Sequence, residues 1–305
     1  MAGPRLHKTK SPMPRTPPKP VTTRPAPPPT RPTTHRSRKT FSIGTWTGEN
    51  EGDKVILYGT SGVGKTSLAA MAPGAVFIGV DDGGRRIRHP ETGEPLRAVT
   101  GVETFYDVQD ALRQKGLVSA GETIVIDTLT KVEHLAEPYM FETIKHEKGG
   151  TVSCLEGYGY GKGYTHLHDI MRSLLQDLDA LVRQGVNIVL ICQNMAIRKA
   201  NPAGTDYLYD GPKLSHPSSE KNSVRLLVCE WADHVINVSY KDAGQKVEAA
   251  KGARYGKIKG QTTRILYAHP EPHFFAKSRT LEHPAISFED SADGSLWHFL
   301  FSEED

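Results

Sequence analysis

Long apolar runs are missing from this chain of 305 residues. No stretch approaches the roughly 20 consecutive apolar residues that a membrane-spanning helix needs, and the first residues lack the apolar core of a signal peptide. Cysteine is scarce as well, because Cys154, Cys192 and Cys229 lie far apart and form no CxxC pair. This spacing suggests neither a zinc site nor a disulfide framework. The sequence therefore predicts a cytoplasmic protein with reduced thiols and no membrane partner.

Acidic residues are absent from the first 40 positions, which hold ten Lys or Arg and eleven of the 21 prolines. The formal net charge of +3 is thus the sum of +10 in this segment and −7 in the remainder. So few large apolar residues bury too little surface to offset the entropy of ordering a backbone. Residues 1–40 are predicted to be a disordered, basic, polyproline-like arm. Such an arm is either a solubilising tail or an electrostatic contact for nucleic acid, which attracts cationic chains irrespective of sequence.

Residues 41–305 alternate short apolar runs with amphipathic segments, a pattern typical of an α/β domain. Strands are predicted where the runs are short, apolar and rich in β-branched residues, at 55–58, 75–80, 123–126 and 187–192. Helices are predicted at 65–72, 106–114, 131–146 and 164–184. Later β-like segments stand at 234–240, 246–250 and 263–268, before a terminal segment at 296–301. We expect a mainly parallel sheet flanked by helices, which continues into C-terminal antiparallel β-hairpins.

The strongest local signal is GTSGVGKT at positions 59–66, which matches the phosphate-binding pattern GxxxxGK[ST] between a predicted strand and a predicted helix. Glycines let the backbone curl until its N–H groups face phosphate oxygens. Lys65 is then expected to reach the β- and γ-phosphates of ATP, and the Thr66 hydroxyl to ligate Mg²⁺. The alternative is a structural glycine-rich turn. The predicted nucleotide-binding residues are Gly59, Thr60, Ser61, Gly62, Val63, Gly64, Lys65, Thr66 and Ser67.

An acidic metal ligand is predicted at Asp127, which follows the apolar run Ile124-Val125-Ile126. A buried parallel strand delivers such a carboxylate to the carboxyl edge of the sheet, where open α/β folds bind their ligands. Asp127 is therefore expected to hold Mg²⁺ together with Thr66, directly or through water. The alternative is that Asp127 only caps the helix that begins after it.

Five features in this order resemble RecA-like ATPases, and among them the short phage and plasmid ATP-binding proteins associated with single-strand DNA annealing and recombination. They are the P-loop, FIGVDDGG at 77–84, the strand ending at Asp127, VLICQN at 189–194 and AKSR at 276–279. The resemblance covers about residues 54–280. It implies a RecA-like P-loop core, magnesium ATP as ligand and single-stranded DNA as partner.

The resemblance also implies roles for single residues. Asp81 or Asp82 stands where such proteins carry the acidic residue, usually Glu, that activates water, although both also fit a turn. Gln193 stands where they place a polar sensor of the γ-phosphate, or it simply closes the sheet edge. Lys277 and Arg279 stand where a basic residue often enters the neighbouring subunit's nucleotide, which requires a homo-oligomer, either ring or filament. The alternative for this pair is a solvated surface.

Two further segments are candidate DNA contacts. Residues 195–222 are predicted to form a long loop at the position of a DNA-binding loop in RecA, with basic and aromatic residues at Arg198, Lys199, Tyr207, Tyr209 and Lys213. The segment GYGYGKGY at 157–164 would, if extended, point alternate tyrosines the same way and stack them on bases. Alternatively it is a flexible joint with tyrosines in the core.

Three functional hypotheses follow from these features. The first is a magnesium-dependent ATPase that acts on single-stranded DNA in phage-type recombination or annealing. The second is a helicase-like hexameric motor on the same core. The third is an ATP-operated binding module with negligible turnover. Aspartate in place of glutamate keeps the third open, since the shorter side chain must still bring a base to within about 3 Å of its water.

Overall fold

The computed structural model describes Gly3 and residues 42–43, 50–80, 82–201, 204–241, 263–288, 290 and 292–301. The predicted arm at 1–40, apart from Gly3, lies outside these residues, as does the predicted β-like segment at 246–250. Every helix and strand reported below lies in the part that begins at Asn50.

A single sheet organises this part of the chain. Its strands are β1 (Lys54–Gly59), β2 (Val76–Gly79), β3 (Ala98–Val99), β4 (Thr123–Asp127), β5 (Asn187–Lys199), β6 (Tyr207–Pro212), β7 (His234–Tyr240), β8 (Arg264–Tyr267) and β9 (Ala285–Phe288). Neighbours follow the order β3-β2-β4-β5-β1-β7-β8-β9, and β6 pairs with β5. The pairs from β3 to β7 are parallel, whereas β8 and β9 are antiparallel. The predicted parallel sheet with C-terminal antiparallel strands is confirmed.

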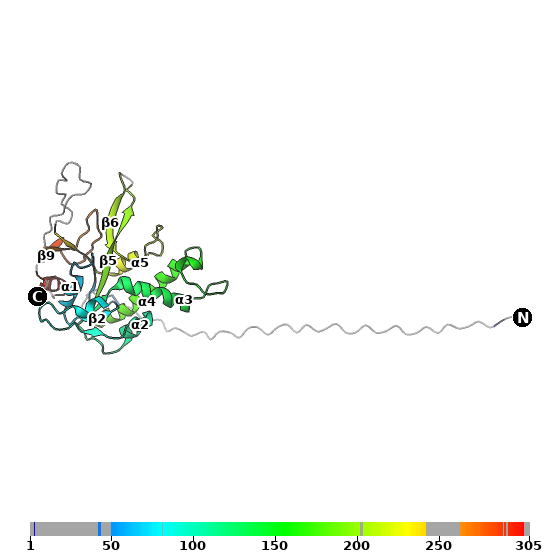
Figure 1. Cartoon of the computed structure of the whole chain (residues 1–305), viewed down its shortest axis with the longest axis horizontal. Helices are drawn as coiled ribbons and strands as arrows, with labels where there is room; N and C mark the ends of the chain where they lie inside the picture. Colours follow the sequence, from blue (N-terminus) through cyan, green and yellow to red (C-terminus); the bar gives the residue numbers. More distant parts are fainter. Residues whose placement is uncertain are drawn as a thin grey trace. The chain divides into compact units, whose positions relative to one another are not determined.

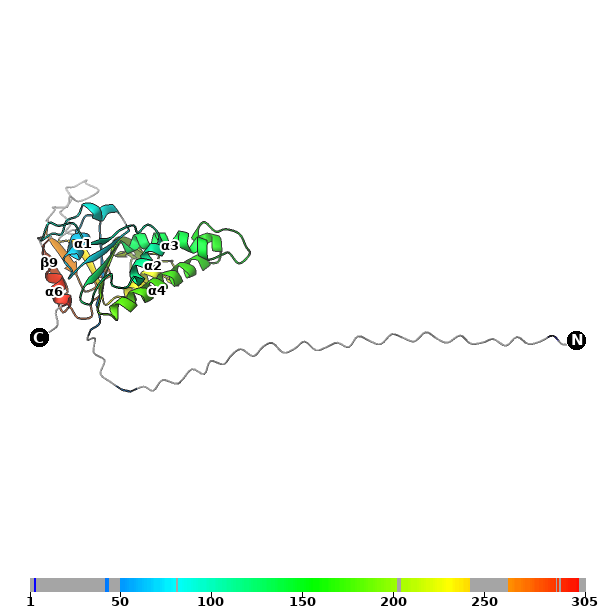
Figure 2. The same ribbon diagram turned by 90° about the horizontal axis from the view of Figure 1, so that it is seen from below.

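Helices cover both faces of the sheet (Figure 2). They are α1 (Lys65–Ala70), α2 (Phe105–Arg113), α3 (Leu129–Thr143), α4 (Lys162–Val182), α5 (Val224–Trp231) and α6 (Ser295–Phe301). Ile56 and Tyr58 of β1 pack in one apolar core with α2 to α5, while Val55 and Leu57 pack in the other with α1 and α6. Because successive side chains of a strand point to opposite faces, strands covered on both sides are apolar throughout. No helix in these described residues is long and apolar enough to span a bilayer.

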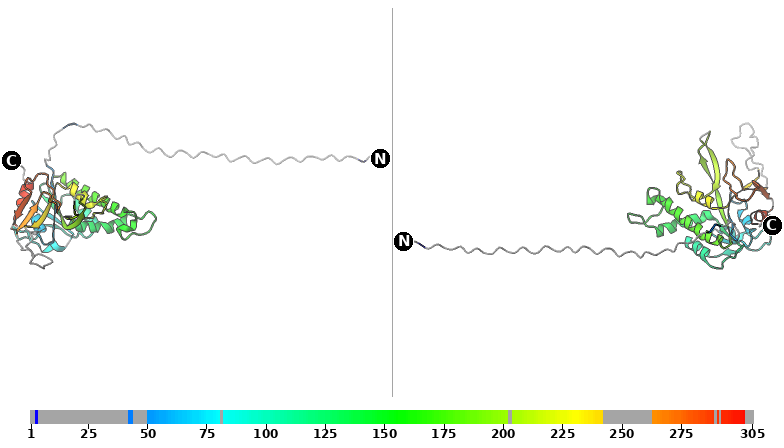
Figure 3. Two further views of the ribbon diagram at one scale, coloured as in Figure 1. Left: turned by 90° about the horizontal axis from the view of Figure 1, so that it is seen from above. Right: turned by 180° about the vertical axis from the view of Figure 1, so that it is seen from behind.

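The prediction of a loop throughout residues 195–222 is wrong. β5 continues past Gln193 to Lys199 and pairs antiparallel with β6, from Asn194 opposite Pro212 to Lys199 opposite Tyr207. This two-stranded segment, the β5–β6 ribbon, projects away from the helices (Figure 1; Figure 3, right). Aromatic residues in β6 and the cross-strand pair of Ile197 with Tyr209 favour an extended pairing over a loop.

The extended tyrosine platform at 157–164 is also not formed. Tyr158 ends the short 3₁₀ helix η2 (Leu155–Tyr158) and is 5% exposed. Its hydroxyl donates to the carbonyls of Met140 and Ile144 at 3.1 and 2.7 Å, which ties the segment to the end of α3. Tyr160, two residues later, is fully exposed. The alternative of a joint with a tyrosine in the core therefore describes this segment.

Candidate functional site

The P-loop connects β1 to α1 at the carboxyl edge of the sheet. Gly62 and Gly64 have φ angles of 79° and 102°, a region that glycine adopts at no steric cost. Lys65 is 8% exposed, and its Nζ donates to the carbonyls of Gly59 at 2.9 Å and Thr60 at 2.8 Å. Burial lowers the pKa of Lys65, and the charge of Asp127 opposes this shift. The ammonium group is thus folded onto the loop whose phosphate ligand it is predicted to bind.

Thr66 and Asp127 meet across this edge. The Thr66 Oγ1 donates to the Asp127 Oδ2 at 2.8 Å. Both residues line the same cleft, and a hydroxyl with a carboxylate supplies the oxygen ligands that Mg²⁺ prefers beside phosphates. The helix cap that was the alternative for Asp127 is supplied by Thr128, whose side chain accepts from the N–H of Lys131. The residues present therefore fit a magnesium ion.

Gln193 lies between the P-loop and Asp127. It belongs to β5, which separates β1 from β4, and it pairs with Gly59 at the end of β1. The N–H of Gln193 donates to Thr130 Oγ1 at 3.2 Å, and that hydroxyl donates to the Lys213 carbonyl at 3.0 Å. The backbone N–H of Lys213 donates to the Gln193 carbonyl at 2.7 Å. The side-chain Nζ of Lys213 lies 3.5 Å from the Gln193 Oε1. Gln193 thus joins the cleft, helix α3 and the base of the β5–β6 ribbon.

The two candidates for the catalytic base follow β2 in the sequence. Asp81 is outside the described residues, and Asp82 begins the 3₁₀ helix η1 (Asp82–Arg86). Strand β2 ends at Gly79, which pairs with Asp127, so the chain enters this segment beside the predicted metal ligand. Gly84 lines the cleft. The choice between Asp81 and Asp82 stays a prediction.

Arg264 is a residue of this cleft that the sequence did not reveal. The cleft has a volume of about 390 Å³, and Arg264 enters it from β8. A Cβ placed on Gly64 would lie 3.0 Å from the Arg264 Nη1, so the guanidinium lies directly against the P-loop. In the sequence this arginine is one residue of a β-like segment, and only the strand order β1-β7-β8 brings it here.

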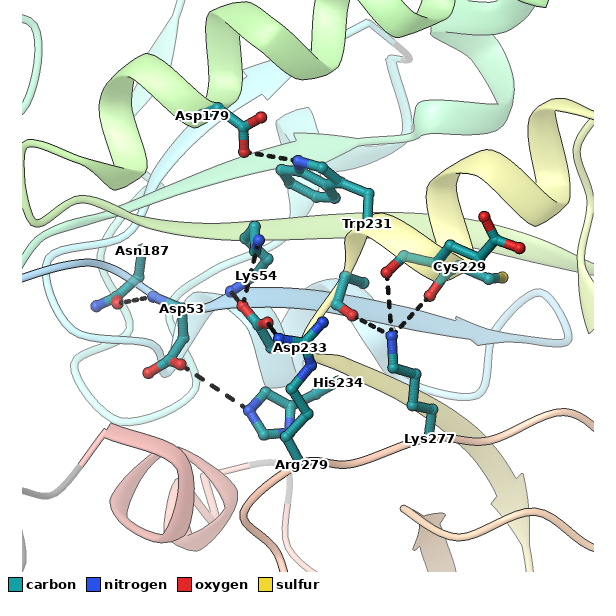
Figure 4. A network of polar contacts seen from close by, with 12 residues as sticks. Asp53, Lys54, Asp179, Asn187, Cys229, Trp231, Asp233, His234, Lys277 and Arg279 are labelled. Atoms are coloured by element: carbon teal, nitrogen blue, oxygen red, sulfur yellow. Dashed lines mark hydrogen bonds and ion pairs between the residues drawn. The ribbon is translucent and has the colours of Figure 1, made fainter. Parts of the chain in front are cut away.

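Lys277 and Arg279 lie at the opposite, amino edge of the sheet (Figure 4). The Lys277 Nζ donates to three carbonyls at the end of α5, those of Cys229, Glu230 and Ala232, at 3.2, 3.1 and 2.7 Å. Arg279 Nη1 lies 3.2 Å from Asp233 Oδ1. Asp233 in turn donates its N–H to the Lys54 carbonyl at the start of β1. The structure does not bring these cations to the P-loop of their own chain, and their role in a neighbour's nucleotide stays a prediction.

A buried histidine completes the amino-edge network in Figure 4. His234 is fully buried, with Nδ1 2.9 Å from the Ser278 Oγ and Nε2 4.0 Å from the Asp53 Oδ1. Burial lowers the pKa of His234 to about 4 and raises the pKa of Asp53 to about 6. The imidazole is therefore neutral near pH 7.

Comparison with known proteins gives a matching family model and likenesses to solved structures. A family model described as AAA domain matches residues 51–280. No curated protein matches the sequence. A KaiC-like protein from the hyperthermophilic archaeon Pyrococcus horikoshii is similar at 15% identity and a TM-score of 0.37, over 78% of this chain and 84% of that chain.

The sheet order, the P-loop after β1 and the Thr66–Asp127 pair define a P-loop ATPase with a RecA-like core. More narrowly, the chain belongs to the AAA domain family, whose model covers well over half of it.

Proposed function

We propose that this chain binds ATP with Mg²⁺ in the P-loop cleft and hydrolyses it. The observation that carries the proposal is the 2.8 Å contact of Thr66 with Asp127 beside Lys65. The P-loop N–H groups and Lys65 bind and orient the phosphates, while Thr66 and Asp127 hold the Mg²⁺, which neutralises charge on the phosphates. Asp81 or Asp82 accepts a proton from the attacking water, and Gln193 contacts the γ-phosphate.

Single-stranded DNA is the partner that we propose for the β5–β6 ribbon. Tyr207 and Leu208 are exposed on it, and the Lys199 Nζ lies 4.6 Å from the centre of the Tyr209 ring. Aromatic faces with nearby cations suit unstacked bases and their phosphates, without a preference for base sequence. The ribbon starts one residue after Gln193, so the proposed phosphate sensor and the proposed DNA contact lie on one strand, β5. The biological setting that we propose is phage-type recombination or annealing, by a homo-oligomer.

The test compares ATP hydrolysis with and without single-stranded DNA, alongside the mass in solution by light scattering. Lys65→Ala should abolish hydrolysis and weaken nucleotide binding while the fold stays intact, because it removes the loop's only side-chain cation. Tyr207→Ala combined with Tyr209→Ala should leave basal hydrolysis intact but weaken DNA binding by about tenfold or more. Tyr160→Ala, another exposed tyrosine, is the control. Undiminished hydrolysis by Lys65→Ala would remove the central proposal.

The cationic arm gives a separate test of the DNA contact. Each phosphate that a cation neutralises adds about 0.7 to the slope of log affinity against log salt for single strands. If roughly half of the ten cations engage, deletion of residues 1–39 should lower that slope by about three to four, with little change in basal hydrolysis. Affinities for oligonucleotides of two compositions across a salt series measure this. An unchanged slope would leave the arm as a tether.

An ATP-operated binding module is the second candidate. It is favoured by aspartate at both positions 81 and 82, and by the hydrogen bonds that link Gln193 to Thr130 and Lys213. In this case ATP would bind tightly and change the protease sensitivity of the β5–β6 ribbon, while single-stranded DNA would not stimulate turnover. Fast, DNA-stimulated hydrolysis would exclude it.

A further inference from the structure

Arg264 reaches the P-loop cleft from β8, on the side of β1 opposite to β5. It begins β8, where it pairs with Tyr240 at the end of β7 and with Phe288 of β9. Its guanidinium carbon lies 5.6 Å from the centre of the Phe288 ring, which is itself buried. The ring contact and the packing against Gly64 place the guanidinium at the wall of the cleft.

The hydrogen-bonding capacity of this arginine is not used up. Its Nε is buried and has no hydrogen-bond partner within the part of the chain that the structure describes. A guanidinium keeps its charge at every physiological pH, and a buried N–H without an acceptor costs free energy. Among the described lining residues of the cleft, Lys65 and Arg264 are the cations and Asp127 is the anion. The cleft therefore carries an excess of positive charge suited to a polyphosphate.

The position of Arg264 along that polyphosphate follows from the strand order. Asp127 and Gln193 come from β4 and β5, on one side of β1, whereas Arg264 comes from β8 on the other side. If Thr66 and Asp127 hold a magnesium ion against the terminal phosphates, those phosphates would lie toward β4 and β5. The α-phosphate and the nucleoside would then extend toward β7 and β8, the side of β1 from which Arg264 comes.

We propose that Arg264 is a nucleotide-binding residue that acts within its own subunit and binds the α-phosphate. The inference rests on the proposed binding of ATP at the P-loop. It assigns to Arg264 a role distinct from that predicted for Lys277 and Arg279, which concerns the γ-phosphate of a neighbour. ATP and ADP carry the same α-phosphate, so Arg264 stabilises both equally and does not distinguish them.

The test measures the affinity of the full chain for ATP, ADP and inorganic tripolyphosphate by calorimetry. Arg264→Gln should weaken ATP and ADP binding by the same factor, about 10- to 100-fold, because a charge-assisted hydrogen bond is lost. Tripolyphosphate binding should weaken as well. Arg264→Lys should lie between, since an ammonium keeps the charge but lacks the planar pair of donors. Arg172→Gln removes an exposed arginine of α4 and should change nothing. Thermal unfolding without nucleotide verifies that each variant is folded.

The outcomes separate this inference from the function on which it rests. Unchanged affinity of Arg264→Gln for ATP and ADP would overturn the α-phosphate contact alone. A loss confined to ATP would move Arg264 to the γ-phosphate, and a loss that spares tripolyphosphate would move it to the base; either result overturns the proposal. If the wild-type chain bound neither nucleotide, the proposed function itself would fail.

Discussion

The Thr66 hydroxyl donates to the Asp127 carboxylate over 2.8 Å and so joins the start of α1 to the end of β4. In the sheet, β5 alone separates β4 from β1, the strand that leads into α1, and both strands end at the same edge. The carboxylate is therefore held beside the phosphate loop by backbone pairing rather than by a mobile loop.

Asp127→Asn tests this arrangement. The amide keeps the size and the contact with Thr66 but removes the charge that holds Mg²⁺. We expect ATP hydrolysis to fall by roughly a hundredfold or more, and to require a higher Mg²⁺ concentration. Hydrolysis measured across a magnesium titration shows both effects. Asp177→Asn, which removes a surface carboxylate paired with Arg113, is the control, and an unaltered magnesium dependence would argue against the metal role.

The catalytic base is assigned by comparing Asp81→Asn with Asp82→Asn. Only the carboxylate that takes the proton from water should matter to the chemical step, so one variant should lose roughly a hundredfold in turnover and the other should not. Both should bind ATP as the wild type does. Single-turnover hydrolysis and equilibrium binding separate the two quantities. If both variants remain fully active, the base lies elsewhere.

Mixed oligomers test Arg279. β1 spans about 17 Å at roughly 3.3 Å per residue, so Arg279 at its amino end lies far from the P-loop of the same chain. If Arg279 serves a neighbour, Arg279→Ala subunits and Lys65→Ala subunits should each be inactive alone but regain part of the activity when mixed. The same mixture should be made with Lys277→Ala, which also uncaps α5 and should lower the thermal midpoint. A fully active monomer would exclude the arrangement.

Glu133 of α3 should make stability depend on pH. It is 5% exposed, and burial raises its pKa to about 7, partly opposed by the hydrogen bond from the Ser215 N–H and reinforced by Glu137. The folded state therefore holds a proton that the unfolded state releases above its pKa of 4.5. The free energy of unfolding should thus decrease as pH rises from about 4.5 to 7.

Glu133→Gln should remove this dependence. Relative to the wild type, the variant should gain up to about 3 kcal/mol of stability between pH 5 and pH 8. Urea unfolding at both pH values measures the difference. Glu142→Gln, an exposed position on the same helix, should show no such gain. An equal effect of Glu133→Gln at the two pH values would contradict the raised pKa.

The sequence predicts the parallel strands closely because strands buried on both faces need apolar side chains at every position. Ile56 and Val55 serve different cores, yet both must be apolar. The β5–β6 ribbon escaped prediction because β5 leaves the core after Gln193, and its later residues mix polar and apolar types. Its pairing with β6 depends on the partner strand rather than on local pattern.

The candidate site likewise contains residues that local sequence patterns predict and one residue that depends on the pairing of distant strands. Local sequence patterns predict the roles of Lys65, Thr66 and Asp127, and the structure brings these residues together in one cleft. Arg264 joins them only through two strand pairings, of β1 with β7 and of β7 with β8, which no local pattern encodes. Tyr158 was predicted wrongly for a related reason. Its flanking glycines suggest an open segment, whereas its hydroxyl donates to two carbonyls at the end of α3, those of Met140 and Ile144.

Because β5 is continuous from the cleft into the ribbon, a small rotation at the cleft would become a larger displacement at the tip of the ribbon. Lys199 lies six positions after Gln193 on β5, a length of about 20 Å, so a rotation of about 5° at the base would shift the tip by about 2 Å. Leu208, which is 67% exposed, lies near that tip. A spectroscopic label attached there would convert movements at the phosphate site that are too small to measure directly into distances that can be read from outside.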